Sequence, residues 1–321
     1  IIVLLILFSI ENVSADLGGD KRIDSLESEI PNGKEDSNQV KLYNSLSFHY
    51  SSRNTDTGIE YAQKALQLAK KIKWKHGLLS AYNSLGINYD VKSDYPKSLK
   101  YYLMAFKEIE DTDKLKSKAI LLNNIGTVYK KQSDYEKALE YFRKSLENGR
   151  KAEYKRAILL ALHNIGSTLS QQGKNSEALK YLNGSLQISE EIDDRAFMSY
   201  SMSSIGAIYS EQSEYSKSMG YFERGLSLCK DLNNKSGIAG FLINIGDVYY
   251  KLALDSIGSS LPKSNENINF NKEINLIKAI KNYQDAILIY EEIGALEGKS
   301  NGFRLLAKAY EHRGNHKKRA D

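Results

Sequence analysis

The strongest constraint in this sequence is a glycine that recurs inside a helical pattern every forty residues. A glycine in the middle of a helix costs about 1 kcal/mol relative to alanine, so an isolated example would carry little weight. Here the tripeptides SLG, NIG, NIG, SIG and NIG end at Gly86, Gly126, Gly166, Gly206 and Gly246. A fixed internal period of this size indicates an array of stacked repeats rather than separate globular domains.

Each repeat is predicted to be a pair of helices. In residues 121–146 an apolar stripe through Leu122, Ile125 and Tyr129 indicates a first helix, and a second stripe follows after residue 134. Ser133 and Glu136 have the S-x-x-E spacing of a capping box, which predicts that the second helix begins there. The chain is therefore expected to be all-α.

A small residue lies twelve positions after most of the repeat glycines. Two helices approach closely only where side chains are small, so Gly126 is predicted to face Ala138 across the hairpin. Aromatic side chains would fill the space beside this contact, and the expected residues are Tyr129 and Phe142, with Tyr89 and Tyr209 in other copies.

This pattern resembles the tetratricopeptide repeat (TPR), a helical hairpin in which the same spacing links glycine, tyrosine, alanine and an aromatic residue. The resemblance covers most of residues 39–321 and implies a right-handed superhelical solenoid of about seven repeats. The period is forty rather than the usual 34, and one copy departs at Leu169 and Leu182. An insertion is expected at about 253–273 in the sixth repeat, and the seventh is expected to be truncated at Asp321.

The N-terminal residues differ from the repeats. Residues 1–15 begin with ten uncharged, mostly apolar residues and end with Val13-Ser14-Ala15, which predicts a signal peptide that is incomplete at its N-terminus. An N-terminal membrane anchor or a buried segment is the alternative. Residues 16–38 hold seven acidic and three basic residues without hydrophobic periodicity, which predicts an acidic, disordered linker.

The sequence gives little support for an enzymatic site or a metal site. The stretch from Gly294 to Ser300 is one residue short of a phosphate-binding loop and follows a helix instead of a strand. His312 and His316 stand four apart, but Gly314 is expected to lie in a turn between them, and no further ligand accompanies them. The single cysteine, Cys229, is expected in the core. We therefore expect no catalytic residue, no cofactor and no bound metal.

The first helices of the repeats are expected to line a concave groove. At 100° per residue, positions near each glycine that face away from the packing stripe carry small polar side chains. The predicted groove residues are Asn83, Asn123, Asn124, Thr127, Lys131, His163, Asn164, Ser203, Asn244 and Asp247. Their amides suit the backbone of an extended peptide; alternatively, they bond neighbouring helices or water and bind no ligand.

Some TPR domains hold the carboxylate end of a peptide with a lysine and arginine clamp. This chain has Asn83, Asn123, His163 and Ser203 at the position of the first clamp lysine, so the resemblance does not extend to that specificity. Lys131 and Lys251 are still expected to be able to contact an acidic partner.

The sequence favours an exported scaffold that binds a protein or peptide. The array also resembles the N-terminal sensory regions of bacterial signalling proteins, in which a membrane segment and a histidine kinase, nucleotide cyclase or DNA-binding effector follow. The alternative is a cytoplasmic regulator that binds RNA or DNA through its basic surface, since the formal net charge is +5. The export signal argues against nucleic acid as the partner.

Overall fold

The computed structural model describes residues 16–30, 36–255 and 271–320. In these ranges it contains 14 helices and no strand, which confirms the all-α prediction. None of the helices described is long and apolar enough to cross a lipid bilayer. The predicted signal peptide lies outside the described residues, as does most of the predicted insertion.

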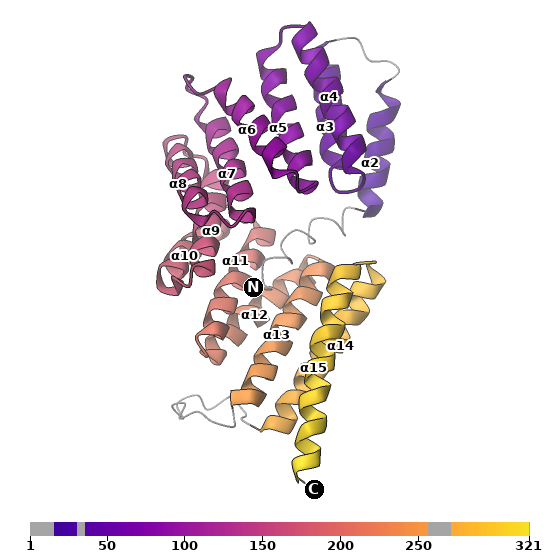
Figure 1. Ribbon diagram of the computed structural model, residues 1–321, viewed down its shortest axis with the longest axis vertical. Helices are drawn as coiled ribbons and strands as arrows, with labels where there is room; N and C mark the ends of the chain where they lie inside the picture. The colour runs from indigo at the N-terminus through magenta and orange to yellow at the C-terminus, as the bar shows by residue number, and fades with distance from the viewer. Residues whose placement is uncertain (1–15, 31–35, 256–270, 321) are drawn as a thin grey trace. The chain divides into compact units, whose positions relative to one another are not determined.

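Residues Ala15–Ile188 form one compact unit, called here the N-terminal unit. From α3 to α9 each helix packs against the next one along the chain, and they lie side by side in sequence order (Figure 1). The pairs α3–α4, α5–α6 and α7–α8 are the predicted helical hairpins. The helices are α2 (Asp16–Ser28), α3 (Ser37–Tyr50), α4 (Thr55–Lys71), α5 (Lys75–Val91), α6 (Tyr95–Lys107), α7 (Leu115–Lys131), α8 (Tyr135–Lys151), α9 (Lys155–Gln171) and α10 (Asn175–Glu191).

A second compact unit contains Ser189–Asp321 and is called the C-terminal unit. Its helices also pack in sequence order, and α11 contacts α13 in addition. Odd-numbered helices from α3 onward are the first helices of their repeats, and even-numbered ones from α4 are the second helices. The C-terminal unit consists of α11 (Arg195–Glu211), α12 (Tyr215–Asp231), α13 (Lys235–Asp255), α14 (Lys272–Glu292) and α15 (Leu296–Ala320).

The turns between helices follow a twenty-residue rhythm. From α4 to α13 every helix begins twenty residues after the one before it. Most of the turns contain one left-handed residue, whose N–H closes the end of the preceding helix. These residues are Lys73, Ser93, Ser133, Glu153, Gly173, Asp193, Ser213 and Asn233.

Ser133 is therefore a turn residue with φ 63°, and the predicted capping box is wrong. Asp134 caps α8 instead, because its side chain accepts a hydrogen bond of 3.2 Å from the Lys137 N–H. The S-x-x-E spacing placed the cap one residue early because it does not show which residue adopts the left-handed conformation.

The repeat glycines lie in contact with a large side chain of the second helix. A Cβ atom on Gly126 would stand 2.7 Å from the ring of Phe142 and 3.2 Å from the carbonyl oxygen of Ala138. Phe142 and Ala138 are fully buried. The prediction that Gly126 meets Ala138 is thus confirmed, although the ring makes the closer contact. A large side chain of the second helix covers each of the other repeat glycines in the same way. These side chains belong to Tyr102, Leu182, Phe222 and Tyr283.

Residues 16–28 form helix α2, so the prediction of a disordered linker is wrong for this segment. Ile23 is 5% exposed and packs with Leu42 and Leu46 of α3, while Leu26 and Ile30 lie against the same cluster. The spacing of Ile23, Leu26 and Ile30 is helical, but the stripe is short and the acidic residues around it obscured the pattern.

The last repeats are longer than predicted from the period. Helices α13 and α14 each have 21 residues, so residues 253–255 and 272–273 of the predicted insertion are helical. Helix α15 continues without interruption through Gly314, and the turn predicted between the two histidines is wrong. Phe303 and Tyr310 of α15 remain about half exposed.

Candidate functional site

The predicted groove amides connect the first helices of neighbouring repeats. In the N-terminal unit, Asn124 donates a 3.2 Å hydrogen bond to the Oδ1 of Asn83, and Asn164 donates one of 2.9 Å to the Oδ1 of Asn123. In the C-terminal unit, Asn244 donates to the hydroxyl of Ser203 at 3.2 Å. Each bond joins residues 41 apart. We call the two N-terminal bonds the amide ladder.

The amide ladder supports both of the interpretations that the sequence left open. The amides do bond neighbouring helices, as expected if they bind no ligand. However, Asn124 and Asn164 are only half-buried, and each uses one side-chain N–H in the ladder. A primary amide carries two N–H donors and an oxygen with two lone pairs, so Asn124 and Asn164 each keep a polar edge, with one donor and one acceptor, that bonds no other described residue. The ladder fixes the orientation of that edge.

Thr127 and Lys131 extend the same face of α7 toward its C-terminal end. The Thr127 hydroxyl donates to the carbonyl of Asn123, one turn earlier, at 2.9 Å. The Lys131 ammonium lies 2.7 Å from a carboxylate oxygen of Asp90 on α5. Burial raises the pKa of Asp90, while the Lys131 charge and hydrogen bond oppose that shift. Lys131 is therefore engaged within the array, which reduces its capacity to contact an acidic partner.

A buried basic pair lies between α7 and α9. The Lys130 ammonium donates a 2.6 Å hydrogen bond to the hydroxyl of Ser167, and Lys130 is only 9% exposed. Burial lowers the pKa of Lys130 to about 8. His163 is also buried, and its burial, together with the nearby Lys130 charge, lowers the pKa of the imidazole to about 3. His163 was predicted in the groove, but the structure places its side chain in the interior.

In the C-terminal unit, Asp247 and Lys251 hold neighbouring helices together. Tyr283 of α14 donates a 2.6 Å hydrogen bond to the Asp247 carboxylate, and burial raises the pKa of Asp247. The Lys251 ammonium donates to the hydroxyl of Ser210 on α11 at 2.9 Å. Both residues were predicted to contact a ligand, and both have partners within the unit.

Three of the tyrosines that follow a repeat glycine by three residues form stacks that the sequence did not predict. Tyr89 stacks on Tyr101 with ring centroids 5.5 Å apart, and Tyr129 stacks on Tyr141 at 5.4 Å. A lysine caps the first ring of each stack at 5.2 Å, as Lys137 does over Tyr129. Tyr209 and Tyr221 repeat the arrangement. The forty-residue spacing of Tyr101, Tyr141, Tyr181 and Tyr221 would have revealed the second ring.

The described residues contain no group of three or more potential metal ligands. Cys229 is buried, as predicted, and burial raises the pKa of its thiol. In the stretch that resembles a phosphate loop, Gly294 occupies a turn with φ 68°, and a Cβ on Gly298 would meet the ring of Tyr290 at 2.6 Å. These two glycines therefore have structural explanations.

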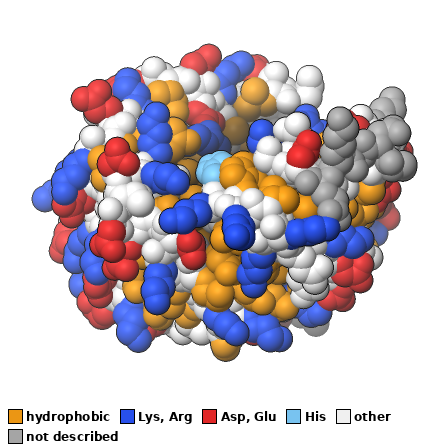
Figure 2. Space-filling view, turned by 90° about the horizontal axis from the view of Figure 1, so that it is seen from above, with side chains coloured by type: hydrophobic (Ala, Val, Ile, Leu, Met, Phe, Trp, Pro, Cys, Tyr) orange, Lys and Arg blue, Asp and Glu red, His pale blue; other side chains and the backbone are white. Residues whose placement is uncertain are grey.

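Charged side chains are mixed on the surface. On the face drawn in Figure 2, lysine and arginine side chains are spread among acidic and apolar ones. Several of the lysines pair with acidic residues on their own helix, such as Lys144 with Glu140 and Lys151 with Glu147. Exposed pairs of this kind contribute little to stability but lower the local charge.

The architecture defines a class of protein: an all-α repeat protein built from helical hairpins, five of which, from α5–α6 to α13–α14, have a glycine where their helices cross. Within that class, the tetratricopeptide repeat model matches residues 92–151, 117–191 and 157–231. Residues 92–231 are therefore tetratricopeptide repeats, and the resemblance noted in the sequence is confirmed. No curated protein matches the chain in sequence.

Solved structures share the fold. A signal transduction ATPase with numerous domains from Pyrococcus horikoshii, which has a tetratricopeptide repeat sensor, matches with a TM-score of 0.64 and 16% identity, over 92% of this chain and 44% of that one. RapI in its apo form matches with a TM-score of 0.58 and 16% identity, over 85% of this chain and 97% of that one. A Rap protein complexed with competence and sporulation factor gives 0.51 and 13%, over 98% and 97%. At these identities the likeness concerns the fold alone.

Proposed function

We propose that this chain is a scaffold that binds a protein or peptide through the first helices α5, α7 and α9 of its N-terminal unit. The observation that carries the proposal is the amide ladder, which fixes Asn124 and Asn164 with one polar edge of each amide still available. Fixed polar groups bind a ligand with less loss of side-chain entropy than mobile ones. The Rap protein solved with competence and sporulation factor is a protein of similar fold with a bound factor.

The spacing of the ladder suits an extended peptide. Packed helices lie about 8–10 Å apart, and an extended chain rises about 3.3 Å per residue. One amide would therefore meet the peptide backbone about every third residue. An amide both donates and accepts, so it matches the N–H and C=O groups of a backbone without selecting a particular side chain. Sequence selectivity would have to come from neighbouring side chains.

The wider context of the scaffold is also a proposal. We propose that it is exported and forms the sensory or regulatory part of a bacterial signalling protein whose effector follows residue 321. The apolar run in residues 1–10 and the small residues Val13, Ser14 and Ala15 support export. Reading the coding sequence beyond residue 321 tests whether an effector domain follows. N-terminal sequencing of the mature protein tests whether a signal peptide is cleaved after residue 15.

Peptide binding can be tested by selecting ligands from a displayed random-peptide library on the purified chain. Selected peptides are then measured against a variant with Asn124→Ala and Asn164→Ala. We expect their affinity to fall about thirtyfold, because one hydrogen bond at each of the two sites is worth about 1 kcal/mol. Asn183→Ala is the matched control, since the exposed Asn183 side chain bonds, within the part of the chain that the structure describes, only the carbonyl of Leu179 in its own helix.

Two results would contradict the proposal. In one, none of the selected peptides binds the double variant more weakly than it binds the original chain. In the other, binding falls only in step with the helical content measured by circular dichroism, which would give the ladder a structural role alone. Binding of RNA that weakens steeply between low and moderate salt would instead favour the nucleic-acid alternative.

A further inference from the structure

From α4 to α9 the regular helix length is broken once, at the end of α6. Helices α4, α5, α7, α8 and α9 each have 17 residues, whereas α6 stops after 13, at Lys107. Residues 108–114 form turns and bends instead of another helical turn. The twenty-residue rhythm of the turns predicts a left-handed residue at position 113, but that residue does not have a positive φ. The beginning of α7 is therefore covered less completely than the beginnings of its neighbours.

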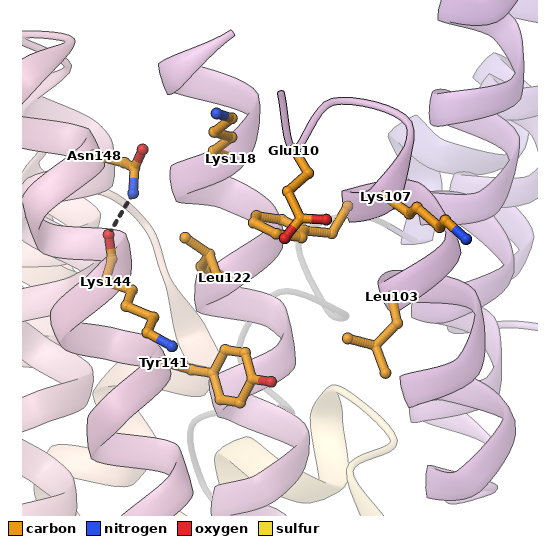
Figure 3. A pocket seen from close by; sticks show the side chains of 9 residues that line it. Leu103, Lys107, Glu110, Lys118, Leu122, Tyr141, Lys144 and Asn148 are labelled. Carbon is orange, nitrogen blue, oxygen red and sulfur yellow. Dashed lines mark hydrogen bonds between the residues drawn. The ribbon is translucent and has the colours of Figure 1, made fainter. Parts of the chain in front are cut away.

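A cavity of about 500 Å³ opens at this interruption, between α6, α7 and α8, and is called here the α6–α8 cavity. Its apolar lining comes from Leu103 and Phe106 of α6, Leu122 of α7 and Tyr141 of α8. Figure 3 shows Leu103, Leu122 and Tyr141 directed into the space between the three helices. Leu103 remains 44% exposed. Covering apolar surface of this kind with another apolar group lowers the free energy of the system.

The rim of the α6–α8 cavity is basic. Lys107, Lys118 and Lys144 line it, against a single carboxylate, Glu110. Lys144 pairs with Glu140 at 2.6 Å. Among the described residues, Lys107 and Lys118 have no ion pair. Two lysine ammonium groups near an apolar surface would attract carboxylates that flank an apolar side chain.

We propose that the α6–α8 cavity docks an acidic segment of a partner protein, with one aromatic or aliphatic side chain of that segment inserted against Leu103, Leu122 and Tyr141. Flanking carboxylates of the segment would then reach Lys107 and Lys118. A nucleic acid fits less well, because the Glu110 carboxylate lies over the cavity and would repel phosphates (Figure 3). This surface involves second helices and goes beyond the function proposed for the amide ladder.

The test uses the purified chain and a fluorescent peptide library in which a central apolar residue is flanked by varied residues. We expect peptides with Glu or Asp beside Phe, Leu or Ile to be enriched. Their affinity should fall about tenfold or more in a variant with Lys107→Glu and Lys118→Glu, because the new carboxylates repel those of the peptide. It should rise several-fold in Glu110→Gln, because that change removes a repelling carboxylate. Leu103→Ser should weaken binding by removing apolar contact. Each of these side chains except Lys118 is exposed, so the fold should be retained.

Lys100→Glu is the matched control, because Lys100 is an exposed lysine of the same helix α6 that does not line the cavity. The proposal is overturned if acidic peptides are not enriched, or if Lys100→Glu weakens them as much as the paired substitution of Lys107 and Lys118. It is also overturned if Leu103→Ser leaves their affinity unchanged. Asn124→Ala with Asn164→Ala should not affect these peptides, so this proposal and the one for the amide ladder fail independently.

Discussion

Replacement of Gly126 by alanine tests the packing that defines the repeat. The added Cβ would lie 2.7 Å from the Phe142 ring, closer than real Cβ contacts, and 3.2 Å from the carbonyl oxygen of Ala138. Because Phe142 is fully buried, its ring cannot move away into solvent. Overpacking of this kind costs about 1–3 kcal/mol, while alanine gains about 1 kcal/mol in helix propensity. We expect Gly126→Ala to lower the free energy of unfolding by up to about 2 kcal/mol.

Gly184 of α10 provides the matched control in the same unit. A Cβ there would meet only the Cδ1 of Leu162, at an ordinary contact distance of 3.5 Å. Gly184→Ala should therefore raise the free energy of unfolding by about 1 kcal/mol through helix propensity. The two alanine substitutions, chemically identical and both within helices, are thus expected to have opposite signs.

A double-mutant cycle tests whether the Phe142 ring causes the destabilisation expected for Gly126→Ala. Phe142→Ala alone should destabilise the unit by about 3–5 kcal/mol, because it leaves a cavity in the core. In that background Gly126→Ala no longer meets the ring, so it should be neutral or stabilising, which gives a coupling energy of about 2 kcal/mol. Urea unfolding followed by circular dichroism measures all four variants.

Two results would refute this packing argument. Gly126→Ala could stabilise the chain as much as Gly184→Ala does, which would mean that the hairpin tolerates the extra carbon. Alternatively, its cost could persist unchanged in the Phe142→Ala background, which would place the clash at the Ala138 backbone instead of the ring.

Four further substitutions are expected to change stability or its dependence on pH. Lys130→Met should raise the free energy of unfolding by about 3 kcal/mol at neutral pH, since the pKa of the buried lysine is lowered to about 8. That gain should shrink between pH 8 and 10.5, where the native lysine loses its proton before the unfolded one; an unchanged gain would contradict the shift. Lowering the pH from 6.5 should destabilise the chain by up to about 1.4 kcal/mol per unit, because unfolded His163 binds a proton that the folded imidazole, with a pKa of about 3, does not. His163→Asn should flatten this slope between pH 6 and 5, and equal slopes would refute it. Glu153→Gly, at φ 49°, should stabilise by about 1 kcal/mol, whereas Gly173→Ala, at φ 74° with open space around it, should destabilise by a similar amount; thermal unfolding of both variants checks the opposite signs.

The repeat pattern alone gave a correct account of much of the fold. The forty-residue glycine spacing predicted the hairpins, and Gly126, Ala138 and Phe142 meet as expected. These contacts join residues of the same hairpin, twelve and sixteen positions apart, and their geometry follows from helix pitch and a short turn. Local errors arose where the pattern was weak, as at helix α2, or where backbone conformation decides, as at Ser133.

Contacts between repeats were not predictable in the same way. Asn124 bonds Asn83, which is offset by one residue from its counterpart Ser84, whereas Ser84 bonds its exact counterpart Asn44. The periodicity places both asparagines on the same face but does not contain that offset. For this reason the sequence could not decide whether the amides bond each other or a ligand.

The sequence by itself determined that the chain forms helical hairpins and which residues meet inside each one, because these contacts depend on spacings written in a single repeat. Only the tertiary structure decided how one repeat lies on the next: the bonds of the amide ladder, the burial of Lys130 beside His163, and the cavity that opens where α6 ends early. Those features depend on the relative position of helices forty residues apart, and packing of whole side-chain surfaces fixes that position.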